Sequence, residues 1–193
     1  KVISDDFVVN DKNSKNEKSK DSSSIEVEAL TSPADFIKLR AETDSAALKK
    51  KFSNDQIYRK NLPLNNSSKS LYNIAEKIRY EALGGKMLKG IKKNLNENYG
   101  QIINLKRKDQ LKSKDDVPVS EAFELYMLKN FHNLSLNTLA KQILSYWEKD
   151  FDNSIKEHIE SLKDNFEDQN KYSSQFSKIL QEMDIFQTED IEE

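Results

Sequence analysis

Two adjacent glycines and a lysine, Gly84, Gly85 and Lys86, are the residues that come nearest to a phosphate-binding loop. Such a loop has the pattern G-x-x-x-x-G-K-[ST], in which backbone amides and the lysine hold phosphates and a hydroxyl holds Mg²⁺. Here Met87 follows the lysine, and the upstream glycine is adjacent to the second one instead of five positions away. We therefore expect no nucleotide site here, and we expect the glycines to cap or break a helix.

Other residue types that support catalysis or metal binding are few and scattered. The 193 residues include no cysteine, which excludes a thiolate metal site and a cysteine nucleophile. The two histidines, His132 and His158, lie far apart in the sequence. No pair of carboxylates has a spacing that indicates general acid and base roles. The sequence therefore predicts no catalytic residue, no metal site and no cofactor bound by this chain.

The elements that would position any functional side chain are predicted to be helices. Gly (4) and Pro (3) are scarce and 33% of the residues are charged, a composition that favours long helices over a sandwich with many turns. We expect a mainly α, multi-helix domain. Since no apolar run approaches the ~20 residues that cross a bilayer, we expect no membrane partner. The missing cysteines favour a reducing, cytoplasmic setting.

Cap signals and apolar stripes place the predicted helices along the chain. Ser32 before Pro33 is a typical helix start, and Ser120 after a proline is another. We expect 135–147 and 155–166 to be two helices or one continuous helix. The predicted helices cover residues 33–52, 71–82, 120–131, 135–147, 155–166 and 172–186.

Three segments make up the expected domain organisation. Residues 1–31 hold two short apolar runs around a polar stretch, which predicts short strands in a small β-hairpin with a disordered polar loop. Residues 32–186 form the helical domain. Residues 187–193 are acidic and look like the start of a linker.

Charge is unevenly distributed, although the formal net charge is only −2. Residues 77–114 hold eleven Lys/Arg against three Asp/Glu, and residues 148–193 hold fourteen Asp/Glu against five Lys. The basic region could bind nucleic acid or an acidic protein, but a charge run is more often a solvated helix face. Because 27 of the 31 basic residues are lysines and not arginines, we consider nucleic acid an unlikely partner.

The stretch RYEALGGKMLKGIKKNL, residues 79–95, resembles a helix signature of the CobT family, a subunit of aerobic cobaltochelatase. The likeness extends upstream to Asp44, Ser45, Ala47 and Leu48, and downstream along the predicted helices to the end of the chain. The resemblance identifies the chain with the helical amino-terminal region of the family, without its carboxyl-terminal integrin-like domain. Family members tend to carry histidines in the segment that matches residues 52–58, and this chain has none there.

The resemblance implies a non-catalytic region of an ATP-dependent complex that inserts cobalt into a corrin precursor during cobalamin biosynthesis. The implied partners are an AAA+ ATPase subunit and a large porphyrinoid-binding subunit, and the complex would use ATP, magnesium and cobalt. The alternative is a helical module that binds nucleic acid or a regulatory protein through residues 77–114.

The signature is also expected to form a helix junction, which either docks a partner or is a simple turn between two packed helices. Arg79 and Glu81 lie two positions apart, so they point to different helix faces and each needs another partner. The candidate partner-binding residues are Arg79, Glu81, Gly84, Gly85, Gly90 and Asn94.

Overall fold

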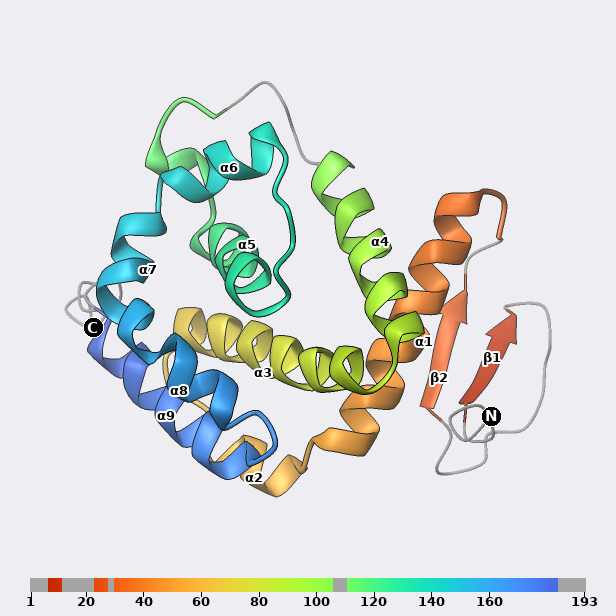
Figure 1. Cartoon of the computed structure of the whole chain (residues 1–193), viewed down its shortest axis with the longest axis horizontal. Helices are drawn as coiled ribbons and strands as arrows, with labels where there is room; N and C mark the ends of the chain where they lie inside the picture. The colour runs from red at the N-terminus through yellow and green to blue at the C-terminus, as the bar shows by residue number, and fades with distance from the viewer. Residues whose placement is uncertain (1–6, 12–22, 28–29, 106–110, 184–193) are drawn as a thin grey trace.

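The computed structural model describes residues 7–11, 23–27, 30–105 and 111–183. Within these ranges the chain is mainly helical (Figure 1), which confirms the predicted fold class. None of the described helices is long and apolar enough to cross a membrane. The α-helices are α1 (Pro33–Phe52), α2 (Asp55–Lys60), α3 (Asn66–Met87), α4 (Lys89–Leu105), α5 (Val119–Phe131), α6 (Thr138–Ser145), α7 (Glu148–Ile155), α8 (Ile159–Asp164) and α9 (Gln169–Glu182).

The predicted start of the first helix is confirmed. The Ser32 hydroxyl accepts a hydrogen bond from the Asp35 amide at 3.3 Å, and the Asp35 carboxylate accepts one from the Ser32 amide at 2.8 Å. This reciprocal pair is a capping box, and Pro33 adds a preset φ in the first turn. The helix ends at Phe52, so it covers the predicted range 33–52.

Two strands precede the helices, β1 (Phe7–Asp11) and β2 (Ser23–Val27). They pair in parallel, with Phe7 opposite Ser23 and Asp11 opposite Val27. The predicted hairpin is therefore wrong, because the strands of a hairpin run antiparallel. The predicted disordered loop between the strands and the predicted acidic linker at residues 187–193 lie outside the described residues.

The segment expected as one or two helices over 135–166 is divided more finely. It contains α6, α7, a 3-10 turn at Lys156–His158, and α8. Between α6 and α7, the Trp147 indole N–H donates to the Val117 carbonyl at 3.0 Å, and the Tyr146 hydroxyl donates to the Leu111 carbonyl at 3.2 Å. These bonds to the preceding segment hold the chain where it changes direction.

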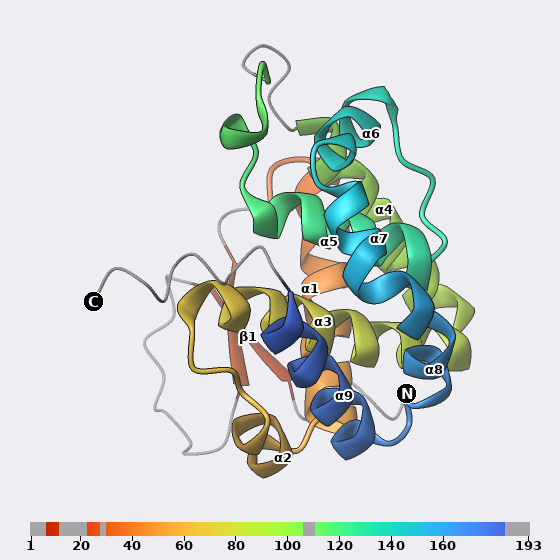
Figure 2. The same cartoon turned by 90° about the vertical axis from the view of Figure 1, so that its left-hand side faces the viewer.

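Helix α3 is the centre of the fold. It packs against α1, α4, α5 and α9, and twelve of its 22 residues are buried. Figure 2 shows α3 crossing the molecule with α9 and α2 below it and α5 above it. A helix that is covered on several sides cannot keep all its polar residues in water, so each polar side chain needs a partner inside the protein.

Glu76 and Arg79 are one turn apart on α3 and form a buried ion pair. The Arg79 side chain is only 1% exposed, and its Nη2 lies 3.3 Å from Glu76 Oε2. The same carboxylate accepts hydrogen bonds from the Gln169 amide at 3.1 Å and from the Ser173 hydroxyl at 2.6 Å, both on α9. The pair thereby joins α3 to α9.

Arg79 also caps two chain segments that end nearby. Its Nη2 donates to the carbonyl of Phe52, the last residue of α1, at 2.8 Å, and its Nη1 donates to the Phe166 carbonyl at 3.0 Å. The terminal carbonyl of α1 has no partner within its own helix, and the Phe166 carbonyl lies in the turn after α8, so the buried guanidinium satisfies both without water. Gln169 extends the network by accepting from the Asn54 amide at 2.6 Å. Arg79, Glu76 and Gln169 thus together hold the end of α1, the start of α2 and the start of α9.

We predict that Arg79→Met lowers the free energy of unfolding by about 3–5 kcal/mol, because it leaves the buried Glu76 carboxylate without its counter-charge and two carbonyls without their donor. Urea unfolding followed by circular dichroism measures this change. The matched control is Lys38→Met, since Lys38 is 67% exposed and pairs with Glu42 at 3.9 Å. It should change stability by less than about 0.5 kcal/mol. Equal small effects of both substitutions would contradict the role assigned to Arg79.

Candidate functional site at the junction of α1, α3 and α4

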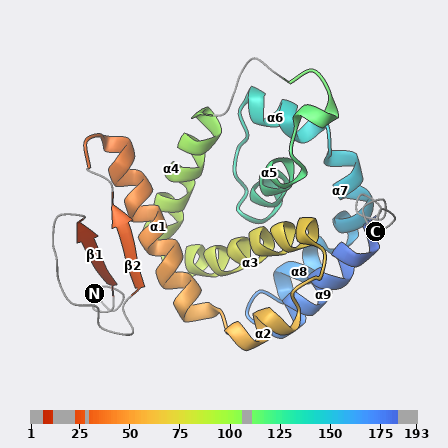
Figure 3. The ribbon, with the colours of Figure 1, turned by 180° about the vertical axis from the view of Figure 1, so that it is seen from behind.

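Two stretches distant in the sequence meet where α3 ends and α4 begins. Helix α1 packs against both α3 and α4, and Figure 3 shows it crossing the corner that these two helices form. The stretches are 44–48 on α1 and the signature 79–95. Most of the side chains singled out in the sequence are therefore neighbours in space.

Glu81 is the buried charge of this junction and is 1% exposed. The Ser45 hydroxyl donates to its Oε1 at 2.5 Å, and the Tyr99 hydroxyl donates to its Oε2 at 2.6 Å. Burial raises the pKa of Glu81, and this rise is opposed by nearby Lys77 and by the two hydroxyl donors. Burial and the neighbouring carboxylate also hold the pKa of Tyr99 well above its usual value.

Asn94 links α4 to α1 through both ends of its amide. Its Nδ2 donates to Asp44 Oδ2 at 2.7 Å, and its Oδ1 accepts from Arg40 Nη2 at 2.6 Å. Asp44 and Arg40 are one turn apart on α1, so the amide bridges them. The bridge ties α4 to α1 on the half-exposed side of the junction.

Gly84 allows α1 and α3 to approach closely. A Cβ atom on Gly84 would lie 2.3 Å from Leu48 Cδ2 and 2.9 Å from Leu48 Cγ. Neither distance is compatible with van der Waals contact, and Leu48 is buried and cannot easily move. Among the described glycines, none has a positive φ. The need for glycine at position 84 is therefore steric and not conformational.

The helix break occurs slightly later than the glycines suggest. Helix α3 runs through Gly84 and Gly85 to Met87, and Leu88 alone links it to α4 in an extended conformation with φ −133 and ψ 112. The predicted junction within the signature is confirmed, but the glycine pair does not form it. A Cβ on Gly85 would make only ordinary contact with Lys92, at 3.5 Å.

The six candidate residues separate into inner and outer groups. Arg79, Glu81 and Gly84 are buried, so a partner cannot touch them while the helices stay packed. As predicted, Arg79 and Glu81 do not pair with each other. Gly85, Gly90 and Asn94 keep some exposure, and docking through them stays a prediction.

Sequence reasoning missed Tyr99 as a partner of Glu81. The signal was present, since Tyr99 lies four residues after Leu95 and extends the apolar stripe of α4. A hydroxyl at the end of an apolar ring reaches a buried carboxylate without exposing the ring to water.

His132 closes the α5 side of the junction. Its ring packs edge-on against Tyr99 with 6.0 Å between ring centroids, and its Nε2 lies 3.4 Å from the Ile78 carbonyl oxygen. Burial lowers the pKa of His132 to about 4, and nearby Lys92 and Lys77 act in the same direction. The ring is therefore neutral at pH 7.

Two cavities adjoin Glu81. One, of about 150 Å³, is lined by residues that include Lys86, Lys92 and His132. The other, of about 250 Å³, lies between α1, α3 and α4 and is lined by residues that include Lys49 and Tyr80. Both carboxylate oxygens of Glu81 already accept hydrogen bonds from the protein, so the junction holds its charge in place and does not offer a reactive group.

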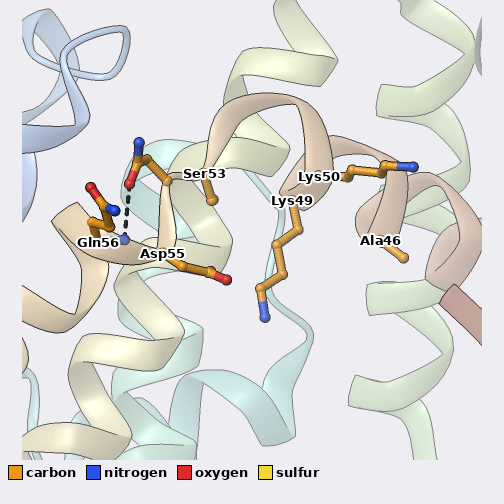
Figure 4. Close-up of a pocket in the computed structure, with 7 residues that line it drawn as sticks. Ala46, Lys49, Lys50, Ser53, Asp55 and Gln56 are labelled. Atoms are coloured by element: carbon orange, nitrogen blue, oxygen red, sulfur yellow. Dashed lines mark hydrogen bonds between the residues drawn. The ribbon is translucent and has the colours of Figure 1, made fainter. Parts of the chain in front are cut away.

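A third depression, of about 660 Å³, lies where α1 meets α2. Figure 4 shows the side chains of Lys49 and Lys50 pointing in different directions there, so their ammonium groups do not converge on one ligand. Elsewhere in the described ranges, no three His, Asp or Glu side chains lie close enough together to hold a metal ion.

Comparison with known proteins identifies one family. The family model described as cobalamin biosynthesis protein CobT matches residues 6–193. No curated protein and no solved structure matches the chain.

We predict that Gly84→Ala lowers the free energy of unfolding by about 1–3 kcal/mol, because the new methyl group overlaps Leu48. Adding Leu48→Ala makes room for that methyl group, so the double variant should lose less stability than the sum of the two single variants. Urea unfolding of the three variants gives the coupling free energy between positions 84 and 48, which is the departure of the double variant from additivity. Gly100→Ala is the control, because nothing lies within 4 Å of its Cβ position. Additive effects would rule out the Leu48 contact as the cause.

We also predict that His132 makes the fold sensitive to acid. The folded protein keeps this ring neutral down to a pKa of about 4, whereas the unfolded chain takes up the proton near the ordinary value of 6.5. Between these values the unfolded state binds more protons, so stability falls as the pH drops, by roughly 3 kcal/mol in all. His132→Gln should lose less stability over this window, measured by urea unfolding at several pH values. His158→Gln, at a half-buried position, should behave like the parent chain.

Proposed function

The chain belongs to the CobT family of cobalamin biosynthesis proteins, and from that premise we propose that it is a non-catalytic part of a cobaltochelatase. In this role it helps a multi-subunit complex to insert Co²⁺, the metal substrate, into a corrin precursor. The observation that carries the proposal is the family match over residues 6–193. The geometry of the junction is consistent with a non-catalytic role, since its polar groups, such as Glu81 with Ser45 and Tyr99, form hydrogen bonds with one another.

The chemistry of metal insertion indicates what the other subunits must supply. Co²⁺ has to lose water ligands, and the macrocycle has to distort so that its nitrogens can reach the metal. ATP hydrolysis is a suitable source of energy for both steps. We propose that an AAA+ ATPase subunit binds ATP and magnesium and that a large subunit binds the porphyrinoid. The present chain would connect them as a structural and coupling element, in a reducing, cytoplasmic setting.

The packing of the junction suits such a coupling element. Helices α1, α3 and α4 are joined by Ser45 with Glu81, by Asp44 with Asn94, and by Leu48 against Gly84. These contacts use a charge, an amide and a close backbone approach, so the three helices move as one body. A rigid body transmits a displacement from one partner to another.

The basic region 77–114 does not lead us to propose nucleic-acid binding. Arg79 is buried, and three lysines of the region pair with carboxylates of the same chain. Lys77 pairs with Glu124, Lys93 with Glu97, and Lys114 with Asp150. Part of the local positive charge is therefore neutralised within the fold.

We predict that the purified chain associates with the AAA+ ATPase subunit but neither hydrolyses ATP nor inserts cobalt alone. Size-exclusion chromatography with light scattering would show a shared peak with the ATPase subunit. Phosphate release and corrin absorbance would stay at background. ATP hydrolysis that scales with the concentration of the chain after further purification, or no association with either proposed subunit, would overturn the proposal.

A further inference from the structure

We propose that the corner between α3 and α4 docks an acidic protein segment that carries an apolar side chain. The corner surface is defined as Lys86, Met87, Leu88, Lys89, Gly90 and Lys92. This inference deepens the proposed function, on which it rests, because it names the chemistry of a partner that a coupling subunit must contact. Apolar exposure and charge support it separately, and a glycine at the corner leaves the backbone accessible.

Apolar side chains project from the corner. Met87, the last residue of α3, is 59% exposed, and Leu88, which follows it, is 47% exposed, although more than half of the residues of α3 are buried. Leu88 is the single extended residue between the two helices, so it and Met87 stand at the outside of the turn. Two adjacent large apolar side chains in water gain stability when a partner covers them.

The corner is also positively charged, and the described residues supply few carboxylates to balance it. Residues 82–96 contain four lysines and no Asp or Glu. Lys93 pairs with Glu97, but no carboxylate among the described residues forms a salt bridge with Lys86, Lys89 or Lys92. The Lys86 ammonium lies 5.3 Å from the centre of the Phe166 ring, which holds it beside the corner. Such a surface attracts a partner of negative charge.

No contact among the described residues requires a glycine at position 90. It is the second residue of α4. Its φ is not positive, and no atom lies within 4 Å of the position that a Cβ would occupy. Gly84, in contrast, is required by Leu48. Gly100 is equally free of contacts, so the lack of contacts alone does not mark a binding site; at the corner, however, Gly90 leaves the backbone open to another molecule between exposed apolar and basic side chains.

A cavity beside the corner can take an anchoring side chain. Its volume is about 150 Å³, and its lining is mixed: Leu95 and Phe131 are apolar, and Lys86 and Lys92 are basic. Glu81 also borders it, but both of its carboxylate oxygens are occupied by the Ser45 and Tyr99 hydroxyls. A cavity of roughly this volume holds one benzene ring. An apolar side chain could enter it while flanking carboxylates meet the two lysines. A nucleic-acid duplex keeps its bases stacked inside and presents no such anchor, so a protein segment fits these features better.

The test measures binding of a fluorescein-labelled peptide, EEEFLEEE, to the whole chain by fluorescence anisotropy. We expect saturable binding that weakens as the salt concentration rises from about 0.05 to 0.5 M. The charge-neutral peptide QQQFLQQQ and the peptide without the apolar anchor, EEEGGEEE, should each bind at least tenfold more weakly. A labelled DNA duplex should not bind with higher affinity than EEEFLEEE.

Variants of the corner surface locate the binding. Lys89→Glu combined with Lys92→Glu should weaken peptide binding at least tenfold, and Gly90→Gln should do the same without lowering Tm. Gly100→Gln is the matched control, since Gly100 is in the same helix and its Cβ position is equally free of contacts. It should leave binding unchanged. Equal effects of Gly90→Gln and Gly100→Gln, unchanged binding in the lysine variant, or preferential binding of DNA would each overturn the proposal. This assay contains no other subunit. A negative result would therefore overturn the proposal for the corner surface but not the proposed association with the ATPase subunit, which the chromatography experiment tests.

Discussion

A buried guanidinium is the constraint on which the rest of this structure depends. Removing Arg79 from water is costly, and the cost is offset only if its donors all find acceptors in the low-dielectric interior. The acceptors are Glu76 on the same helix and the carbonyls of Phe52 and Phe166, which belong to other parts of the chain. The ends of α1 and α8 must therefore come to α3 in one arrangement. Apolar packing alone would tolerate several arrangements of these helices.

Glu81 imposes the same kind of constraint on the opposite side of α3. Its two oxygens require donors from α1 and α4, and Ser45 and Tyr99 provide them. The Glu76–Arg79 pair and Glu81 lie on different faces of one helix, so the pair fixes the position of α9 and Glu81 fixes that of α4. The buried polar side chains of α3 thus determine where its neighbouring helices pack, while leucines and aromatic rings supply most of the buried apolar area.

Local signals were enough to predict some elements and not others. Ser32 and Pro33 act through bonds within one turn, so the start of α1 could be read from the sequence. Burial of Arg79 and Glu81 could not, because charged residues are usually exposed and only the tertiary fold brings Phe52, Phe166, Ser45 and Tyr99 to them. Parallel pairing of β1 and β2 also escaped prediction, since short apolar runs do not encode strand direction.

The one-residue link at Leu88 has a mechanical consequence. A longer loop would absorb a displacement of α4 by rotating many bonds, whereas here only one residue separates two regular helices. Helix α4 has 17 residues and forms an arm about 25 Å long. A turn of α1, α3 and α4 together by 10° would carry the tip of α4 by about 4 Å over that length. The tie between Asn94 and α1 lies near the base, so a force on the arm acts as torque on the core.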